Sequence, residues 1–362
     1  MDDDRKISLG EGAGGELMQK MLGELVIPLL READIDDDPA GLSPGLLDDS
    51  AAVDDVAITI DGHTVWPLEF PGGDIGSLSV YGTVNDLWVV GARPRALALS
   101  MVIEEGLDRS LLRRISSSIG SASRSAGVII ATGDTKVVER GGVKGMIIST
   151  AGIGIKHPLL DENCKRASFL RSGSGEKAPV SPWLRDDGVR KGDVIILSGS
   201  IGDHGISLLS FREGYGFDTE LVSDLAPLGE VIEAALRIGG VIAAKDLTRG
   251  GLSNGLNEWC GKSGHSIHVS GPDIPVKPAV ASACDMLGLD PYEIGNEGKV
   301  ILAVAPGSEE EILEAVRRTR TGKDAAIIGH VGATGRNVIL ETEIGGNRIM
   351  DPPYGDPVPR IC

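Results

Sequence analysis

Residues 71–94 read PGGDIGSLSVYGTVNDLWVVGARP, and this stretch decides the fold. Its glycines and Asp74 predict a turn that opens a helix, and apolar residues recur at helical spacing behind it. We expect the helix to run over 75–90 and a buried strand to follow over 96–103. A helix that leads directly into a buried strand is typical of an α/β unit.

Strands and helices alternate on both sides of this block. Residues 51–60 and 63–68 predict two strands that form a hairpin at Asp61-Gly62. The other predicted elements of the first half are a helix opened by Asp108 and strands over 128–131 and 143–153.

The second half repeats this alternation after a segment rich in Gly, Ser, Pro and charge. We therefore predict two α/β units, or α+β units with mixed sheets. The expected organisation is an N-terminal segment over 1–40, a first domain over 41–156, a linker with a mobile excursion over 157–192, a second domain over 193–350 and a flexible tail over 351–362.

Composition excludes several classes of function. Thirty-five basic and fifty-three acidic residues give a net charge of −18, which disfavours binding to nucleic acid or to an anionic membrane. No apolar run approaches the ~18 residues of a membrane-spanning helix, and the N-terminus does not resemble a secretory signal. The four cysteines, which lack a CxxC pair, predict a cytoplasmic protein with reduced thiols; they are Cys164, Cys260, Cys284 and Cys362. The first three are expected to be small buried hydrophobic residues.

The tail reads DPPYGDPVPRIC over 351–362 and closes on Cys362. Its prolines exclude a helix and favour an extended arm. A thiol at the tip of such an arm can enter a site as a nucleophile and carry an acyl group. The structural alternative is a tail that is simply ordered against the surface.

Aspartates recur at the ends of predicted elements and beside glycines. Carboxylates in such positions suit Mg²⁺, and glycine-rich turns before helices offer backbone N–H groups to phosphates. The turns with this form are PGGDIG and DLTRGGL, and the aspartates are Asp48, Asp49, Asp61, Asp74, Asp86, Asp134 and Asp246. Each aspartate alone is more simply a cap or a turn residue.

Three further side chains are candidates for chemistry. Lys136 is a phosphate partner, a proton-transfer group or a surface charge, and Glu297 is a general base or a turn residue. His204 is expected to be a structural cap of the helix that it opens. The sequence contains neither a GxxxxGK[ST] phosphate loop nor a convincing Ser/His/Asp set.

Several of these motifs together resemble one known family. The segments GAGGELM, PGGDIG…GTVNDL…GARP, TGDTKVV, DLTRGGLSNGLNE and the closing PRIC run from about residue 10 to the last residue. They resemble the HypE family of hydrogenase maturation proteins, within the PurM-like (aminoimidazole-ribonucleotide-synthetase related) ATP-dependent superfamily. The excursion over about 171–188 looks longer than is typical of that family, and the pair Asp48-Asp49 leaves one ligand ambiguous.

The resemblance implies a fold and a reaction. The fold has a ferredoxin-like N-terminal domain that pairs with its twin in a homodimer, a C-terminal α/β domain and an extended tail. In the reaction, Cys362 receives a carbamoyl group from carbamoyl phosphate through the carbamoyltransferase HypF. ATP-dependent dehydration then converts the S-carboxamide to an S-cyanide, and the cyanide passes to iron on the HypC–HypD complex for the [NiFe] hydrogenase centre.

The resemblance also implies roles for residues. Cys362, Lys136 and Glu297 would be catalytic, and it stays open whether Lys136 or Glu297 is the base. Mg²⁺–ATP would be held by Asp49, Asp61, Asp86 and Asp246. The other implied nucleotide-binding residues are Gly72, Gly73, Asp74, Asn85, Gly133, Asp134, Thr135, Arg249 and Gly250.

Two alternative functions remain at this point. One is another PurM-like ATP-dependent synthetase or kinase that acts on a free small molecule, for which the tail would be dispensable. The other is a non-catalytic scaffold whose tail docks on a partner.

Overall fold

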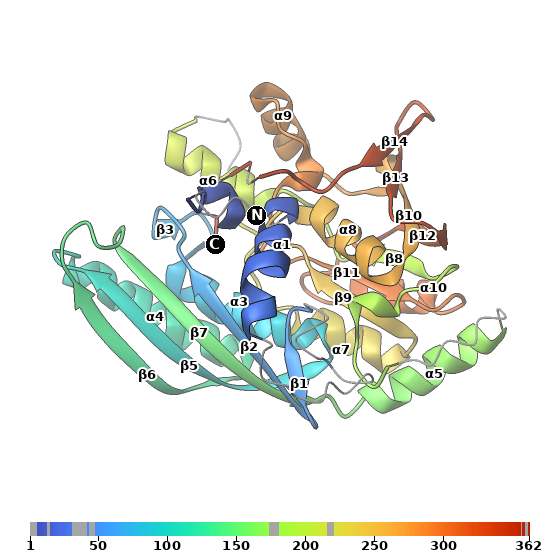
Figure 1. Cartoon of the computed structure of the whole chain (residues 1–362), viewed down its shortest axis with the longest axis horizontal. Helices are drawn as coiled ribbons and strands as arrows, with labels where there is room; N and C mark the ends of the chain where they lie inside the picture. The colour runs from blue at the N-terminus through green and yellow to red at the C-terminus, as the bar shows by residue number, and fades with distance from the viewer. Residues whose placement is uncertain are drawn as a thin grey trace.

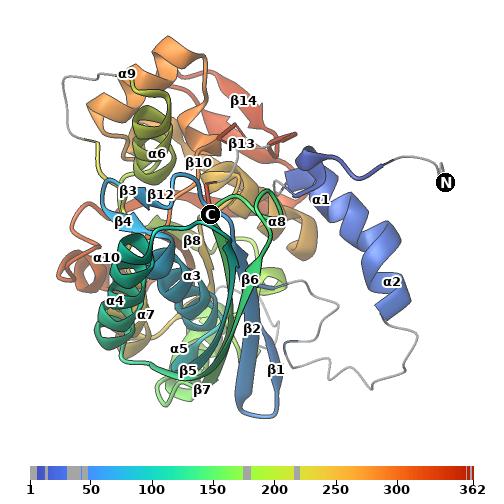
Figure 2. The ribbon, with the colours of Figure 1, turned by 90° about the vertical axis from the view of Figure 1, so that its left-hand side faces the viewer.

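The computed structural model describes residues 6–12, 15–30, 42, 48–173, 181–215, 221–355, 357–358 and 361–362. Figure 1 shows two units, each built around one large sheet, with the C-terminus lying between them. The view turned by 90° in Figure 2 places the C-terminus at the same junction.

The first unit is a five-stranded sheet in the order β1-β2-β7-β5-β6. β5 and β6 run parallel, and the other neighbouring strands run antiparallel. Two helices, α3 (Ile75–Val89) and α4 (Arg109–Ala126), cover one face of the sheet. The strands are β1 (Ala51–Val53), β2 (Val56–His63), β5 (Ala92–Glu104), β6 (Ile129–Val138) and β7 (Met146–Lys156).

The helix predicted over 75–90 is confirmed as α3, and its start is fixed by a capping box. The Asp74 side chain accepts a hydrogen bond from the backbone of Ser77 at 2.8 Å, and the Ser77 hydroxyl lies 3.0 Å from the backbone N–H of Asp74. α3 is buried on most of its faces because it packs both on the first sheet and against the second unit. A helix that is apolar on most sides is expected in such a central position.

The second unit is a seven-stranded sheet in the order β14-β13-β10-β12-β8-β11-β9. α7 (Gly229–Ile238) and α10 (Glu309–Arg317) pack on one face, and α8 (Gly251–Ser263) packs on the other. The strands are β8 (Val194–Leu197), β9 (Val241–Asp246), β10 (His265–Ser270), β11 (Val300–Val304), β12 (Ala326–Thr334), β13 (Val338–Glu341) and β14 (Asn347–Met350).

The remaining elements are short or lie at the periphery. They are η1 (Leu9–Gly12), α1 (Gly15–Met21), η2 (Leu22–Val26), α2 (Ile27–Leu30), β3 (Glu69–Phe70), β4 (Gly73–Asp74), α6 (Asp203–Glu213), η5 (Gly271–Asp273), α9 (Pro278–Leu287) and η6 (Pro291–Glu293). None of the helices in the described ranges has the length and apolar character needed to cross a membrane.

The hairpin predicted at Asp61-Gly62 is wrong. The turn between β1 and β2 instead lies at Asp54-Asp55, where Val53 pairs with Val56 and Asp54 adopts a φ of +54°. Aspartate tolerates this left-handed conformation better than most residues, so Asp54 can form the turn without glycine. Asp61 and Gly62 instead continue β2 and pair with β7, and the strand predicted over 63–68 is not formed.

Residues 157–192, expected to form a linker and an excursion, contain helix α5 (Leu160–Gly173) and the short helix η4 (Asp186–Gly188). Leu160 and Ala167 are fully buried, because α5 packs against β9 and α7 of the second unit. Part of the excursion, over 174–180, lies outside the described residues. In the expected N-terminal segment, the ranges 1–5, 13–14 and 31–40 also lie outside them.

The two units share one apolar core. A single cluster runs from the first sheet through α3 into the second sheet and includes Leu78 and Leu302. Asn85 adds polar contacts across the same junction. Its side chain accepts from the backbone N–H of Leu228 at 2.8 Å and donates to the backbone oxygen of Ala226 at 3.1 Å. The junction is therefore a packed interior, and it fixes the position of everything that lies along it.

Candidate active site

The end of the tail lies inside the molecule, at the junction of the two units (Figure 2). Thr64 donates from its backbone N–H and from its hydroxyl to the backbone oxygen of Cys362, at 3.0 and 3.1 Å. His204 Nε2 lies 2.9 Å from the backbone oxygen of Ile361, whose side chain is almost completely buried. The tail thus brings the half-buried Cys362 to the place where both units contribute residues.

Arg249 links Cys362 to the acidic part of the junction. The negative charge of Cys362 is the main reason why the pKa of Arg249 is raised, and Asp61 and Glu297 add to the effect. Arg249 Nη1 also donates to the backbone oxygen of Gly12 at 3.1 Å. One guanidinium group therefore connects the tail, the carboxylates and the N-terminal segment.

The four aspartates predicted to hold magnesium come together from separate elements. Asp49 precedes β1, Asp61 lies on β2, Asp86 lies on α3 and Asp246 ends β9. Burial raises the pKa of Asp86 and of Asp246 well above the usual range, and repulsion from the other carboxylates raises both further. Groups that repel one another in this way form one electrostatic cluster.

Hydroxyl groups orient two of these carboxylates. Thr83 Oγ1 donates to Asp61 at 3.1 Å, and Thr59 Oγ1 donates to Asp86 at 2.9 Å. Within the part of the chain that the structure describes, no three His, Cys, Asp or Glu side chains are arranged to hold a metal ion as they stand. The aspartates are gathered but do not converge on a single point.

Glu297 lies beside this cluster, in the loop between η6 and β11. Glu297 is 4% exposed. Burial is the main cause that raises its pKa well above the usual value, and repulsion from Asp246 and Asp224 raises it further. Its backbone N–H donates to Asp224 Oδ1 at 3.0 Å, which fixes the loop. A raised pKa makes this carboxylate a stronger proton acceptor, as a general base requires.

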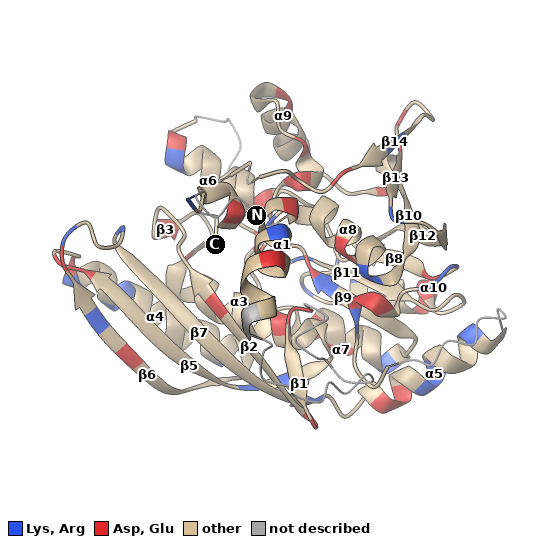
Figure 3. Cartoon of the chain, viewed as in Figure 1, with Lys and Arg blue, Asp and Glu red and all other residues tan. Residues whose placement is uncertain are grey.

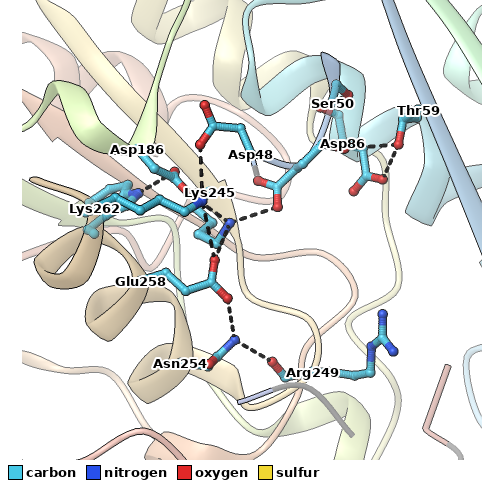
Figure 4. A network of polar contacts seen from close by, with 12 residues as sticks. Asp48, Ser50, Thr59, Asp86, Asp186, Lys245, Arg249, Asn254, Glu258 and Lys262 are labelled. Carbon is cyan, nitrogen blue, oxygen red and sulfur yellow. Dashed lines mark hydrogen bonds and ion pairs between the residues drawn. The ribbon is translucent and has the colours of Figure 1, made fainter. Parts of the chain in front are cut away.

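A cavity of about 610 Å³ opens beside the aspartate cluster, between α1 and α8. Figure 4 shows the charged network along its wall. Lys245 Nζ lies 2.8 Å from Asp49, 2.9 Å from Glu258 and 3.2 Å from Asp186. Burial alone would lower the pKa of Lys245, but these three carboxylates raise it well above its usual value. Lys245 is therefore a buried and fully charged cation.

Lys262 extends the network, at 2.6 Å from Asp186 and 3.1 Å from Asp48. Burial alone would raise the pKa of Asp186, but Lys245 and Lys262 together hold it well below its usual value. Trp259 Nε1 donates to the same carboxylate at 2.7 Å. The sequence analysis missed Lys245, Asp186, Glu258 and Lys262. The available signal was a lysine inside the otherwise apolar strand that precedes Asp246.

Two buried acceptor atoms on residues that line this cavity lack a hydrogen-bond partner among the described residues, namely Asp48 Oδ2 and Asn254 Oδ1. Burial and the neighbouring Asp186 raise the pKa of Asp48 to about 7. An acceptor buried without a partner is destabilising, so these atoms mark places where a cation or a ligand donor fits.

Lys136 is not brought to Glu297 within one chain. The TGDTK segment lies inside β6, where Gly133, Asp134, Thr135 and Lys136 are all exposed. Lys136 Nζ pairs with Asp134 at 2.9 Å. Figure 3 shows blue and red together on β6, well apart from the charged positions on α8 and β9. Three strand spacings separate β6 from β2, which at the usual spacing is about 14 Å.

The PGGD turn has structural contacts in this fold. A Cβ atom on Gly72 would lie 2.8 Å from Val222, and one on Gly73 would lie 2.6 Å from Leu225. These glycines therefore allow the loop of the second unit to approach the first. Asp74 caps α3, and Asn85 links the two units, as described above. Nucleotide binding by these four residues stays a prediction.

Gly250 lets the tail pass over the start of α8. Its φ is +77°, and a Cβ atom there would lie 2.9 Å from Cγ of Pro353. Ser253 Oγ donates to the backbone oxygen of Asp351 at 2.6 Å, one turn further along the helix. The DLTRGGL turn thus guides the tail as well as placing Arg249.

His204 was predicted to be a helix cap, and this is wrong. The N-cap of α6 is Gly202, and no side chain caps the helix. The His204 ring contacts Ser223, Phe70 and the tail instead. Sequence reasoning missed this contact because its partner lies 157 residues further along the chain.

Three comparisons bear on this geometry. Models of the AIR synthase related proteins match the chain at 47–156 (N-terminal domain) and 190–341 (C-terminal domain). The carbamoyl dehydratase HypE of Rhizobium leguminosarum is 42% identical over 99% of this chain and 95% of its own length. A crystal structure of the hydrogenase maturation protein HypE in complex with ATP has a TM-score of 0.77 at 38% identity, over 98% of this chain and 100% of that one. HypE in a crystallised HypE–HypF complex has a TM-score of 0.78 at 38% identity, over 91% of this chain and 100% of that one.

The matches agree with the two-unit architecture, because one family model covers each unit and the relatives have nearly the same length as this chain. They confirm the two-domain PurM-like fold that the motifs implied. The similarity extends over nearly the whole chain and includes the tail. This chain therefore belongs to the HypE carbamoyl dehydratase family of the AIR synthase related proteins.

Proposed function

We propose that the chain is an ATP-dependent carbamoyl dehydratase that acts on an S-carboxamide carried by its own Cys362. The observation that carries this proposal is the inward tail, whose backbone is held by Thr64 and His204 beside Arg249. The reaction converts Cys–S–C(=O)NH₂ and ATP into Cys–S–C≡N, ADP and phosphate. The cyanide would become a ligand of iron in the [NiFe] hydrogenase centre.

The chemistry needs a leaving group and a base. Transfer of the terminal phosphoryl group of ATP to the amide oxygen makes that oxygen a good leaving group. The C–O bond then breaks as phosphate departs, and the C≡N bond closes as the nitrogen loses its protons. We assign the base to Glu297, because its raised pKa suits proton transfer and it shares the junction with Cys362. Lys136 would then stabilise negative charge.

The cavity between α1 and α8 is the proposed nucleotide site. Its volume suits a ligand of nucleotide size, and Arg249 and the unpartnered oxygen atoms of Asp48 and Asn254 lie on its wall. The HypE structure solved with ATP supports the binding of ATP, and the position of the site is our proposal.

The aspartate cluster fits Mg²⁺. Burial and mutual repulsion raise the pKa of Asp86 and of Asp246, a cost that a bound cation would relieve, and hard oxygen atoms are the ligands that Mg²⁺ prefers. Asp49, Asp61, Asp86 and Asp246 would hold the ion. When bound, Mg²⁺ would neutralise charge on the triphosphate. Lys245 would have to release Asp49 for that carboxylate to serve as a ligand.

We further propose a homodimer in which each site is completed by the second copy. Among the described residues, the sheet face opposite α3 and α4 carries exposed isoleucines, which include Ile58, Ile60 and Ile153. Apolar residues exposed together on a sheet face are typical of an interface. Lys136 lies on the edge strand of this sheet, away from its own Glu297. Pairing of two sheets would give Lys136 of one copy a route to the site of the other.

HypF and the HypC–HypD complex are the proposed macromolecular partners. The crystallised HypE–HypF complex supports the first of them. The second rests on the family resemblance and on the need for an acceptor of cyanide. We propose a cytoplasmic location, because four widely spaced cysteines without a CxxC pair are typical of proteins that keep their thiols reduced.

A time course followed by mass spectrometry tests the proposal. The chain is incubated with carbamoyl phosphate, ATP, Mg²⁺ and the carbamoyltransferase, and samples are taken at intervals. We expect the peptide that contains Cys362 first to gain one carbamoyl group and then to lose one water. A Cys362→Ser variant that still yields cyanide would overturn the proposal.

A further inference from the structure

The last two residues of the tail are held by groups from both units. Thr64 binds the backbone oxygen of Cys362, and His204 binds the backbone oxygen of Ile361. Gly205 and Gly295 lie against the side chain of Ile361. We call these four residues (Thr64, His204, Gly205 and Gly295) the tail seat.

The proton of His204 is placed for this contact by a relay. The backbone oxygen of Ile361 can only accept a hydrogen bond, so the neutral His204 ring must carry its hydrogen on Nε2, which lies 2.9 Å from that oxygen. Nδ1 then accepts from the Ser223 hydroxyl at 2.7 Å, and Ser223 Oγ in turn accepts from the backbone N–H of Leu225 at 3.1 Å. His204 is fully buried and packs edge-on against Phe70, so its ring has a fixed orientation.

The side chain of Ile361 fills a pocket whose size depends on two glycines. A Cβ atom on Gly205 would lie 3.1 Å from Cδ1 of Ile361, and one on Gly295 would lie 3.0 Å from it. Any residue larger than glycine at either position would therefore crowd the isoleucine. Ile361 is 3% exposed and belongs to the same apolar cluster as α3.

A second apolar contact anchors the tail three residues earlier. Val358 is 1% exposed and packs with Ile206, Val280 and Ile294 between α6 and α9. Tyr354, by contrast, is 74% exposed. The burial is thus confined to particular tail positions rather than spread along the whole arm.

We propose that the tail seat positions Cys362 for reaction, and that its pocket selects the residue before the cysteine by size and apolarity. Thr64 and His204 contact backbone oxygens, which do not change when the thiol gains or loses a group. The seat can therefore hold the free, carbamoylated and cyanated forms alike. This inference rests on the proposed function, because it concerns the substrate arm of that reaction.

The rate at which Cys362 is alkylated reports how firmly the tail is held in the seat, and this measurement does not require catalytic activity. The full chain is treated with a thiol reagent, and modification of Cys362 and of Cys164 is followed by peptide mass spectrometry. Cys164 is also half-buried but lies on α5, away from the seat, so it serves as the internal reference. A change in overall stability affects the alkylation rates of both cysteines, so the ratio of the two rates reports on the tail.

Substitutions in the tail, in the seat and in the relay test these contacts one at a time. Ile361→Ala should raise the rate ratio about tenfold, and Ile361→Val only about twofold, because valine keeps most of the buried volume. Tyr354→Ala, the matched control, should leave the ratio unchanged. Thr64→Val and Ser223→Ala should each raise the ratio about threefold, since each removes one hydroxyl from the seat or its relay.

Turnover provides the second measurement. In carbamoylated protein, Ile361→Ala should slow the loss of water at saturating ATP and leave the KM for ATP unchanged, as expected when only the arm is misplaced. Equal rate ratios for Ile361→Ala and Tyr354→Ala would overturn the inference, and so would normal turnover in Ile361→Ala. If the ratio shifts as expected but the parent protein never loses water, the proposed function fails and the seat stands.

Discussion

Lys245 holds Asp49 in an ion pair of 2.8 Å, deep in the wall of the proposed nucleotide site. The same ammonium group contacts Asp186 and Glu258, so one cation serves three buried carboxylates. Removing one partner of a buried ion pair is much more costly than never burying the charges. Lys245 is therefore as much a requirement of the fold as of the site.

We expect Lys245→Met to lower the free energy of unfolding by about 3–5 kcal/mol, because it leaves buried carboxylates without their cation. Urea unfolding followed by circular dichroism measures the change. Lys165→Met is the matched control, since Lys165 forms a solvent-exposed pair with Glu162 and should leave stability almost unchanged. Equal effects of the two substitutions would contradict the assigned role.

Binding of Mg²⁺–ATP should release protons and become tighter as pH rises. The pKa of Asp86 and of Asp246 is raised in the folded protein, chiefly by burial and then by neighbouring carboxylates. A metal ion binds only the deprotonated forms, so it displaces these protons. Calorimetry in buffers of different ionisation enthalpy counts them. The same number released from an Asp86→Asn variant would argue against this role of Asp86.

Without the nucleotide, the same two groups should make stability fall with rising pH. A carboxyl whose pKa is raised on folding binds more protons in the folded state than in the unfolded one. Its contribution is present below the ordinary aspartate pKa of about 4 and is lost as pH rises through the folded-state value. Thermal unfolding at several pH values should show a smaller decline for Asp86→Asn than for the parent. An equal decline would be contrary to expectation.

Glu297→Gln should block the loss of water and leave carbamoylation of Cys362 intact. The glutamine cannot accept a proton, and general-base catalysis typically contributes about 10²–10⁴ in rate. Single-turnover mass spectrometry on the carbamoylated protein measures this step. Glu293→Gln is the control, since Glu293 lies in the same loop region but outside the junction. Wild-type rates for Glu297→Gln would assign the base elsewhere.

A mixture of two inactive variants tests whether copies share a site. If Lys136 of one copy serves Glu297 of the other, Lys136→Ala and Glu297→Gln chains should complement each other. After exchange of subunits, half of the dimers are mixed and half of their sites are intact, so about a quarter of the parental activity returns. Addition of Ile60→Asp to both chains should abolish this recovery, because Ile60 is 75% exposed on the proposed interface. A mixture that stays inactive would place both groups in one chain.

Local patterns in the sequence predicted the parts of the site that depend on nearby residues. The helix that carries Asp86 followed from its apolar spacing. The structure brings Asp86 into electrostatic contact with Asp49, Asp61 and Asp246, and their role as magnesium ligands stays a prediction. The hairpin was misplaced because Asp61-Gly62 has turn chemistry, yet both residues have partners on β7. Two turn-forming residues do not by themselves determine whether they form a turn or pair with another strand.

Contacts between distant segments escaped the sequence analysis. His204 meets the tail, and Lys245 meets Asp49 and Asp186, only after the two units have packed. The prediction for Lys136 was limited in the same way, because its motif indicates a role but does not indicate which copy of the chain Lys136 serves. The local sequence around a residue does not indicate which distant segment, or which copy of the chain, that residue will contact.

The helix α3 lies between the two sheets, and a single apolar cluster passes through it. Neither half can melt while its neighbour stays ordered without exposing this shared interior to water. Heat or denaturant should therefore give one cooperative transition rather than two. Because each half supplies contacts to the tail and carboxylates to the junction, the integrity of the catalytic apparatus depends on both halves staying folded together.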